Sequence, residues 1–301
     1  MAKILVIIDP DATEQTALLR CTEMAPAANL EIHVVRFIEQ PKHLPKDDTT
    51  MATVLEKAKE DMDPLVANLK YDGYHVTTDV LPFVRLYEAI IQTAASIKAD
   101  FVFKPLRKHS AIARTLFTST DWNLIRLCPL PLLLTSNVPQ ITGRPVVAAI
   151  DVCNSDPGHE ELNRIVLSQA NVVGRTVQGV VHAVNAFHTP TAVWGNGVDD
   201  PVAIEMCYAS QQDHLREAVR LSEEFGIPQE HVTVAEGAAE RVVNDLATEL
   251  SAGLIVLGTV ARSGLSGLFI GNTAEAVLEH SNTDVMVVKQ VDFKSPIAAA
   301  A

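Results

Sequence analysis

The chain repeats its own pattern of apolar residues, and this duplication limits what it can fold into. Residues 99–135 align with residues 252–288 without a gap at an offset of 153 (252 − 99 = 153), which places ADFVFKP over AGLIVLG. In a second pair of segments, ILVIID at 4–9 and VVAAID at 146–151, an aliphatic run ends at an aspartate. With 301 residues the chain is long enough for two domains. We therefore predict two domains of the same fold.

The predicted domains cover residues 1–138 and 144–292, and SNVPQITG forms the linker. In both halves short aliphatic runs alternate with longer amphipathic segments. This order is typical of a doubly wound α/β fold, so we expect two tandem, open, five-stranded parallel sheets of Rossmann-like type. The expected strands lie near 3–9, 30–38, 75–82, 100–104, 131–135, 145–151, 177–186, 231–236, 253–257 and 284–289. The expected helices lie near 13–27, 50–70, 85–97, 119–127, 157–172, 202–225, 238–250 and 272–281.

Charge and composition argue against several classes of partner. The chain has 24 Lys and Arg against 37 Asp and Glu, a net charge of −13, which disfavours a nucleic-acid-binding face. The start, MAKILVIIDPD, meets Asp and Pro too early for a signal peptide, and no apolar run reaches the roughly 18 residues of a membrane span. We therefore expect a cytoplasmic protein. The cysteines, at 21, 128, 153 and 207, are too far apart for a typical zinc site, and we expect no bound metal of that kind.

A glycine-rich segment after the fourth strand of the second half carries the strongest chemical signal. It runs from Gly258 to Glu275, GTVARSGLSGLFIGNTAE, and leads directly into an expected helix. Glycines allow a close backbone approach, and the first N–H groups of a helix favour anions, here those of Asn272 and Thr273. A ligand with two or three phosphates fits this pattern. No Lys follows Gly271, so it is not a Walker loop, and Arg262 is the cation inside the segment.

This segment resembles the signature of the universal stress proteins, in particular the tandem two-domain E-type members. ATP-binding members carry G-x2-G-x9-G-[ST]. Here Gly258 is followed by Ala261 at the second glycine, nine residues, Gly271, and Asn272 at the Ser/Thr position. FTSTDWNLIRLCP in the first half is similar to the degenerate copy of E-type proteins.

The resemblance implies a stress-response regulator that binds ATP, or AMP or ADP, in its C-terminal domain, with Mg²⁺ able to accompany the nucleotide. It also implies that the halves pack through their edge strands as an internal pseudo-dimer. The partner proteins are not identified, and a homodimer is also compatible. The implied ligand-binding residues are Asp151, Val184, Gly258, Val260, Ala261, Arg262, Gly271, Asn272 and Thr273.

Within this set, Asp151 is assigned to the base or the ribose, and the backbone near Val184 to the adenine. A structural role for Asp151 as a helix cap is equally compatible with its place after the strand. In the first half, the same alignment puts Pro105, Lys108 and Thr118 at the three glycine positions. Because proline has no N–H, a phosphate donor is lost there. We therefore expect a nucleotide site in the second domain only.

Two other functions stay open. An adenine-nucleotide hydrolase would carry a glycine-rich loop after its first strand, where this chain has DPDATE and DVCNSD. No pattern marks a catalytic residue, so we expect at most slow ATP hydrolysis. A scaffold without nucleotide, or a binder of an apolar metabolite, could keep the glycine-rich segment only for folding, and Ala261 and Asn272, which depart from the motif, leave that alternative open.

Overall fold

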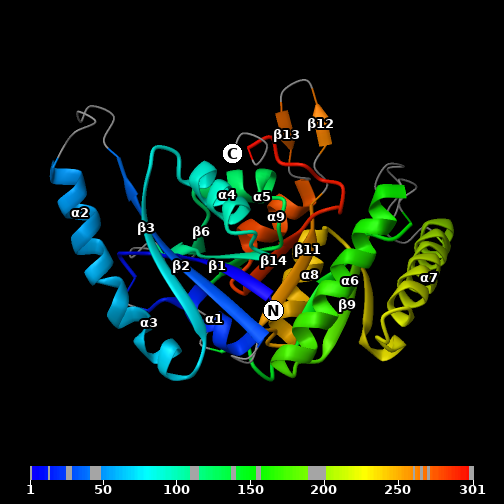
Figure 1. Ribbon diagram of the computed structural model, residues 1–301. Coiled ribbons are helices and arrows are strands. Elements are labelled where there is room, and N and C mark those ends of the chain that lie inside the picture. The colour runs from blue at the N-terminus through cyan, green and yellow to red at the C-terminus, as the bar shows by residue number, and fades with distance from the viewer. Residues whose placement is uncertain are drawn as a thin grey trace. The chain divides into compact units, whose positions relative to one another are not determined.

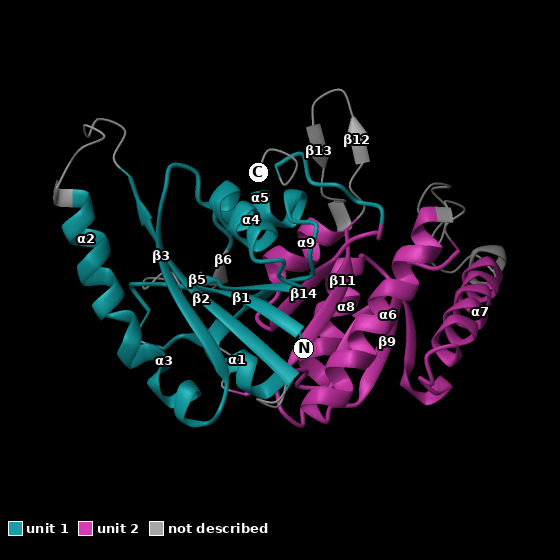
Figure 2. Cartoon of the chain, viewed as in Figure 1, with its two compact units in different colours: residues 1–137, 292–301 teal, residues 138–291 magenta. Residues whose placement is uncertain are grey.

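The computed structural model describes most of the chain, in two compact units. The described residues are 2–12, 14–24, 29–40, 49–108, 115–136, 140–153, 157–188, 201–259, 262–264, 267–269 and 272–297. Unit 1 comprises residues 1–137 together with 292–301, and unit 2 comprises residues 138–291 (Figure 2). Each unit contains parallel strands and helices in alternation (Figure 1).

Unit 1 is built on a parallel sheet in the order β7-β4-β1-β2-β3. The chain enters it through β1, whose residues 4–8 are buried. A short antiparallel hairpin, β5 and β6, follows β4. The elements are β1 (Ala2–Ile8), α1 (Thr16–Met24), β2 (Leu30–Glu39), α2 (Thr49–Glu60), α3 (Met62–Tyr71), β3 (His75–Phe83), α4 (Leu86–Ser96), β4 (Phe101–Pro105), β5 (Arg107–Lys108), β6 (Thr115–Leu116), α5 (Ser119–Leu127) and β7 (Leu132–Thr135).

Unit 2 repeats this topology, with a parallel sheet in the order β14-β11-β8-β9-β10. Its counterpart of the first hairpin is β12 with β13. The elements are β8 (Val146–Ala149), α6 (Pro157–Val177), β9 (Val181–Phe187), α7 (Pro201–Glu223), the 3-10 helix η3 (Gln229–His231), β10 (Val232–Glu236), α8 (Ala239–Glu249), β11 (Leu254–Gly258), β12 (Arg262–Gly264), β13 (Gly267–Phe269), α9 (Asn272–His280) and β14 (Asp284–Val288).

Helices cover both faces of each sheet. Right-handed crossovers place α6 and α7 on one face of the unit 2 sheet and α8 and α9 on the other. Contacts agree with this arrangement: Arg164 of α6 pairs with Glu224 just after α7, and Asn244 of α8 donates to the Val277 carbonyl of α9. These features confirm the predicted tandem, parallel α/β fold. No helix in the described ranges has the length and apolar content needed to cross a bilayer.

Helix ends show the repeat at the level of single residues. Lys98 after α4 and Ser251 after α8 both have positive φ, 55° and 50°, and they are 153 positions apart (251 − 98 = 153). In each case the next N–H donates to a carbonyl five residues earlier, Ala99 to Ala94 and Ala252 to Ala247. A left-handed residue in this hydrogen-bond pattern is a common helix terminator.

The clearest differences from the predicted boundaries lie in two regions of the chain. The helix expected at 50–70 is divided into α2 and α3, because Pro64 has no N–H to continue the hydrogen bonds across the junction. The helix expected at 157–172 continues to Val177, and β9 starts at Val181 instead of 177. Gln178 ends that helix with a φ of 58°, and Gly179 N–H bonds the Gly174 carbonyl.

Candidate functional site

The site is organised around the carboxyl end of β8, the first strand of unit 2. β8 lies between β9 and β11, so the chain leaves it toward one side of the sheet and later returns on the other. Such a reversal of strand order opens a crevice at the carboxyl ends of the strands. Asp151 lies two residues after Ala149, the last residue of β8, on this side of the sheet.

Two buried asparagines hold the backbone on either side of the Asp151–Val152 peptide bond. The Asp151 N–H donates to Asn163 Oδ1 (2.9 Å), and Asn163 Nδ2 donates to the Asp151 carbonyl (2.8 Å). The Val152 N–H donates to Asn185 Oδ1 (3.0 Å), and Asn185 Nδ2 lies 3.0 Å from His214 Nδ1. Neither asparagine was among the residues predicted from the sequence. The available signal was a polar residue in otherwise apolar positions, as in the strand sequence VHAVNAF.

The side chain of Asp151 has a separate partner. His159, in the first turn of α6, places Nδ1 3.1 Å from Asp151 Oδ2. The imidazole is 12% exposed and the aspartate side chain 58% exposed. The carboxylate is therefore contacted by a mostly buried ring while much of it stays open to solvent. His159 was not among the residues predicted from the sequence.

Val184 and Gly258 lie on the strands that flank β8. The Ile150 N–H donates to the Val184 carbonyl (2.9 Å), and the Val184 side chain is fully buried. Gly258 ends β11, where an added Cβ would come within 2.5 Å of Leu162 Cγ on α6. The missing side chain of Gly258 therefore serves close packing between strand and helix. The structure brings Asp151, Val184 and Gly258 together around the carboxyl end of β8.

The rest of the predicted site lies in the glycine-rich segment. Its backbone forms the antiparallel hairpin of β12 and β13, in which Arg262 pairs with Phe269, and α9 begins at Asn272. Val260, Ala261 and Gly271 lie outside the described residues, and for Arg262, Asn272 and Thr273 the description covers the backbone.

A lysine reaches the start of this segment from the next strand. Lys289, just after β14, is 8% exposed and donates from Nζ to Thr259 Oγ1 (3.1 Å). Thr259 immediately follows Gly258, and its N–H donates to the Val288 carbonyl. The sequence pointed to Arg262 as the cation of the loop, because Lys289 is distant along the chain. The fold adds an ammonium group at the beginning of the glycine-rich segment.

Unit 1 is built differently at the matching place. Asp121, in the first turn of α5, is fully buried, and its Oδ1 lies 2.7 Å from Lys104 Nζ. Its Oδ2 accepts from both the N–H and the hydroxyl of Thr118, each at 2.7 Å, and the Asp121 N–H donates to Thr118 Oγ1 in return. Thr118 and Asp121 thus form a capping box, and a carboxylate of the chain itself occupies the N-terminus of α5.

The comparison with known proteins identifies the family. The sequence model of the universal stress protein family matches residues 1–136 and again residues 143–289. The chain belongs to the universal stress protein family. It is 30% identical to universal stress protein E of Escherichia coli K12 over 312 residues, which covers 98% of this chain and 96% of that protein. The tandem E-type resemblance seen in the sequence is thereby confirmed, and this places the chain in a stress-response family.

Solved structures of similar proteins agree with this assignment. A functionally unknown protein from Pseudomonas aeruginosa PAO1 has a TM-score of 0.73 and 28% identity, covering 99% of this chain and 94% of that one. A universal stress protein from Archaeoglobus fulgidus DSM 4304 has a TM-score of 0.69 at 17% identity, covering 96% and 98%, and shares the fold.

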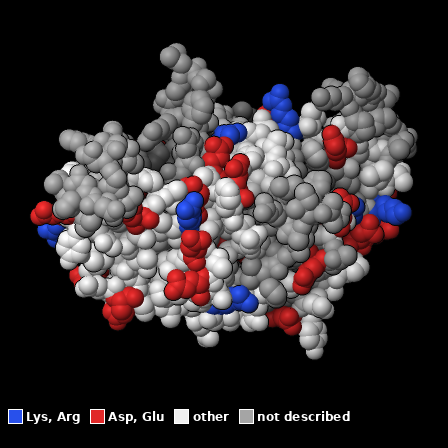
Figure 3. All heavy atoms as spheres, turned by 180° about the vertical axis from the view of Figure 1, so that it is seen from behind, with Lys and Arg blue, Asp and Glu red and all other residues white. Residues whose placement is uncertain are grey.

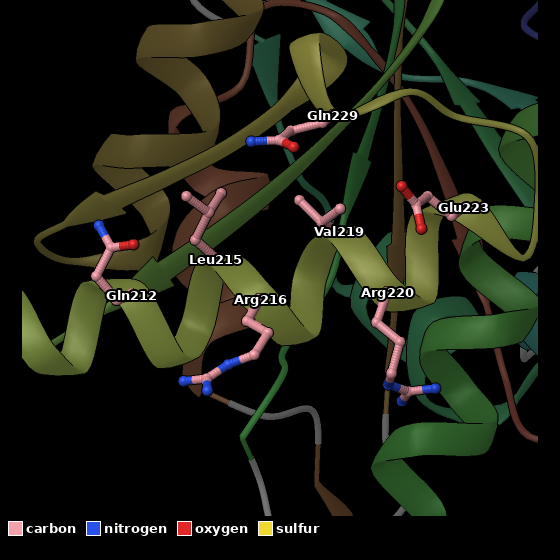
Figure 4. Close-up of a pocket in the computed structure, with 7 residues that line it drawn as sticks. All are labelled: Gln212, Leu215, Arg216, Val219, Arg220, Glu223 and Gln229. Atoms are coloured by element: carbon pink, nitrogen blue, oxygen red, sulfur yellow. The ribbon is translucent and has the colours of Figure 1, made fainter.

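A hollow of about 560 Å³ lies along α7 of this universal stress protein (Figure 4). Leu215 and Val219 point to one side of the helix there, and Arg216 and Arg220 to the other. None of the predicted ligand-binding residues lines it; the lining is Gln212, Leu215, Arg216, Val219, Arg220, Glu223 and Gln229. This hollow is therefore separate from the predicted site at the carboxyl end of β8.

The described surface carries charged side chains of both signs, and some of them cluster: Arg164 and Arg220 pair with Glu160 and Glu224. On the face drawn in Figure 3, Asp and Glu side chains are scattered between isolated Lys and Arg, in line with the net charge of −13. Among the His, Cys, Asp and Glu residues that the structure describes, no three are grouped so that they could hold a metal ion.

Proposed function

We propose that this universal stress protein binds ATP or another adenine nucleotide in unit 2, and that the bound state regulates its contacts with protein partners. Three features support the proposal. The glycine-rich segment keeps most of the family signature, it follows a strand beside the reversal of strand order, and Lys289 supplies a cation at its start. Asp151 and Gly258 lie near the carboxyl ends of the neighbouring strands β8 and β11.

The difference between the two units carries the proposal. In unit 1, Asp121 and Thr118 cap α5, so that its N-terminal N–H groups have an internal anion. At the same offset of 153, unit 2 has Ala274 for Asp121 and Gly271 for Thr118. Neither residue can supply a capping oxygen from its side chain. Because a helix N-terminus attracts anions, phosphate groups are suited to the start of α9.

Different residues of unit 2 would contact the nucleoside and the phosphates of the ligand. Asp151 suits hydrogen-bond donors of the nucleoside, and Lys289 together with the N–H groups at 272–273 suits the phosphates. A bound nucleotide would bring Mg²⁺ as a counter-ion to its phosphates. From 258 to 275 the sequence contains a single carboxylate, Glu275, so we expect binding with little turnover.

Isothermal titration of the full chain with Mg-ATP tests the proposal. We expect saturable binding at one site per chain. The double variant Gly271→Thr/Ala274→Asp copies the unit 1 capping pair into unit 2, and its carboxylate should exclude phosphate and abolish binding. Asn282→Asp adds the same charge at an exposed position after α9 and serves as the control, with binding retained.

Two results would refute the proposal. One is the absence of both heat and thermal shift at millimolar ATP. The other is full binding by the capped double variant. Release of ADP followed over hours distinguishes a binding protein from a hydrolase.

A further inference from the structure

The aspartates that follow the first strand of each unit have similarly held backbones. Asp9 donates its N–H to Gln15 Oε1 (3.2 Å), and Gln15 Nε2 donates to the Asp9 carbonyl (2.8 Å). Asn163 makes the same pair of bonds to Asp151. Because one side-chain amide holds each backbone in both units, this feature belongs to the fold.

The carboxylates of the two aspartates have different surroundings. In unit 1, Asp9 Oδ1 accepts the N–H of Asp11 (3.1 Å), so it is turned back into its own loop. In unit 2, Asp151 Oδ2 lies 3.1 Å from His159 Nδ1 instead. The two aspartates are 142 positions apart (151 − 9 = 142), and the same offset places Ala17 of α1 at the position of His159 (159 − 142 = 17). Ala17 is buried, and its methyl group cannot make this contact. The imidazole contact is thus specific to the unit with the proposed site.

We infer that His159 is a positioning residue that orients the Asp151 carboxylate toward the nucleoside part of the ligand; this inference rests on the proposed function. Asn163 holds the N–H and the carbonyl of Asp151, so the backbone is fixed separately from the side chain. His159 limits rotation of that side chain from a mostly buried position. Its own turn is anchored as well, because Gln290 Nε2 donates to the Gly158 carbonyl (2.9 Å).

The charge of the carboxylate decides which part of the ligand it meets. A carboxylate accepts hydrogen bonds and repels phosphate, so Asp151 suits a ribose hydroxyl or the exocyclic amino group of the base. Holding the group in place before binding reduces the entropy lost on complex formation. Removal of His159 should therefore weaken binding of a nucleotide and spare binding of a phosphate chain without a nucleoside.

Titrations with Mg-ATP and with inorganic tripolyphosphate test this inference. His159→Leu should weaken ATP binding about tenfold, the order expected when the hydrogen bond between the Asp151 carboxylate and the nucleoside is lost. Tripolyphosphate binding should change less than twofold. His159→Asn, whose amide can reach the carboxylate from nearly the same place, should restore most of the affinity for ATP. His75→Leu, in unit 1, is the matched control and should bind both ligands normally.

A double-mutant cycle completes the test. In an Asp151→Asn background, His159→Leu should change ATP affinity less than twofold, because the charged group that it orients is gone. The inference is wrong if His159→Leu binds ATP as the unsubstituted chain does, if both ligands lose affinity equally, or if the loss persists in the Asp151→Asn background. An unsubstituted chain that binds no ATP overturns the proposed function, and this inference with it.

Discussion

The buried ion pair of unit 1 gives the sharpest prediction. Lys104 is 5% exposed and Asp121 fully buried, and their charged atoms are 2.7 Å apart. Asp121→Asn removes the negative charge but keeps an oxygen that can accept from Thr118. The substitution therefore breaks the ion pair and leaves much of the α5 cap in place.

The expected loss is large because it leaves the Lys104 ammonium buried without its counter-ion. Removing one partner of a buried pair costs about 3–5 kcal/mol, a large part of the roughly 5–15 kcal/mol by which domains are stable. Replacing both partners by apolar residues is often nearly neutral. The variant Lys104→Leu/Asp121→Ala copies Leu257 and Ala274 of unit 2, and we expect it to lose only about 1 kcal/mol with the cap.

Urea unfolding followed by tryptophan fluorescence measures both effects. The chain has two tryptophans, and Trp122 lies on α5 beside Asp121, so in a Trp194→Phe background the signal reports unit 1. A loss below about 1 kcal/mol for Asp121→Asn would refute the reasoning. So would a double variant no more stable than the single one.

Two more predictions concern unit 2. Gly258→Ala places a Cβ 2.5 Å from Leu162 Cγ and should destabilise the unit by about 1–3 kcal/mol, as measured by urea unfolding. Leu162→Ala should cost less stability in the Gly258→Ala variant than in the unsubstituted chain. Additive losses would contradict the packing argument. Burial, and then nearby His231, lowers the pKa of His182 from its ordinary 6.5. At this position the unfolded chain therefore binds more protons than the folded chain, so stability falls as pH drops below about 6.5. His182→Gln should flatten the curve of Tm against pH in that range. An unchanged slope would contradict the prediction.

The sequence predicted the order of elements because that information is local. Aliphatic runs such as Leu254–Leu257 form buried strands, and amphipathic spacing, as in Val243, Leu246 and Ala247 of α8, forms a buried helical face. Helix ends were less predictable, since they depended on a left-handed residue at Gln178 and on Pro64.

Contacts between distant residues were beyond sequence reasoning. Asn163 is 12 positions from Asp151, and Asn185 is 33 from Val152, so no spacing rule links them. At Gly258 the sequence predicted only a close approach of a ligand, and the structure adds a second reason for glycine, because an added Cβ would come within 2.5 Å of Leu162 Cγ. Loss of phosphate donors in the first half was predicted from Pro105, but the capping carboxylate of Asp121 was not recognised.

By itself the sequence determined a duplicated α/β fold, the family, and the half that keeps the glycine-rich signature. These follow from periodicity and motif, which each segment carries alone. Only the tertiary structure decided which polar side chains bind the backbone after β8, and that a carboxylate of unit 1 caps α5. Those features depend on folding, because burial brings together groups from separate elements and makes each hydrogen bond or charge depend on its partner.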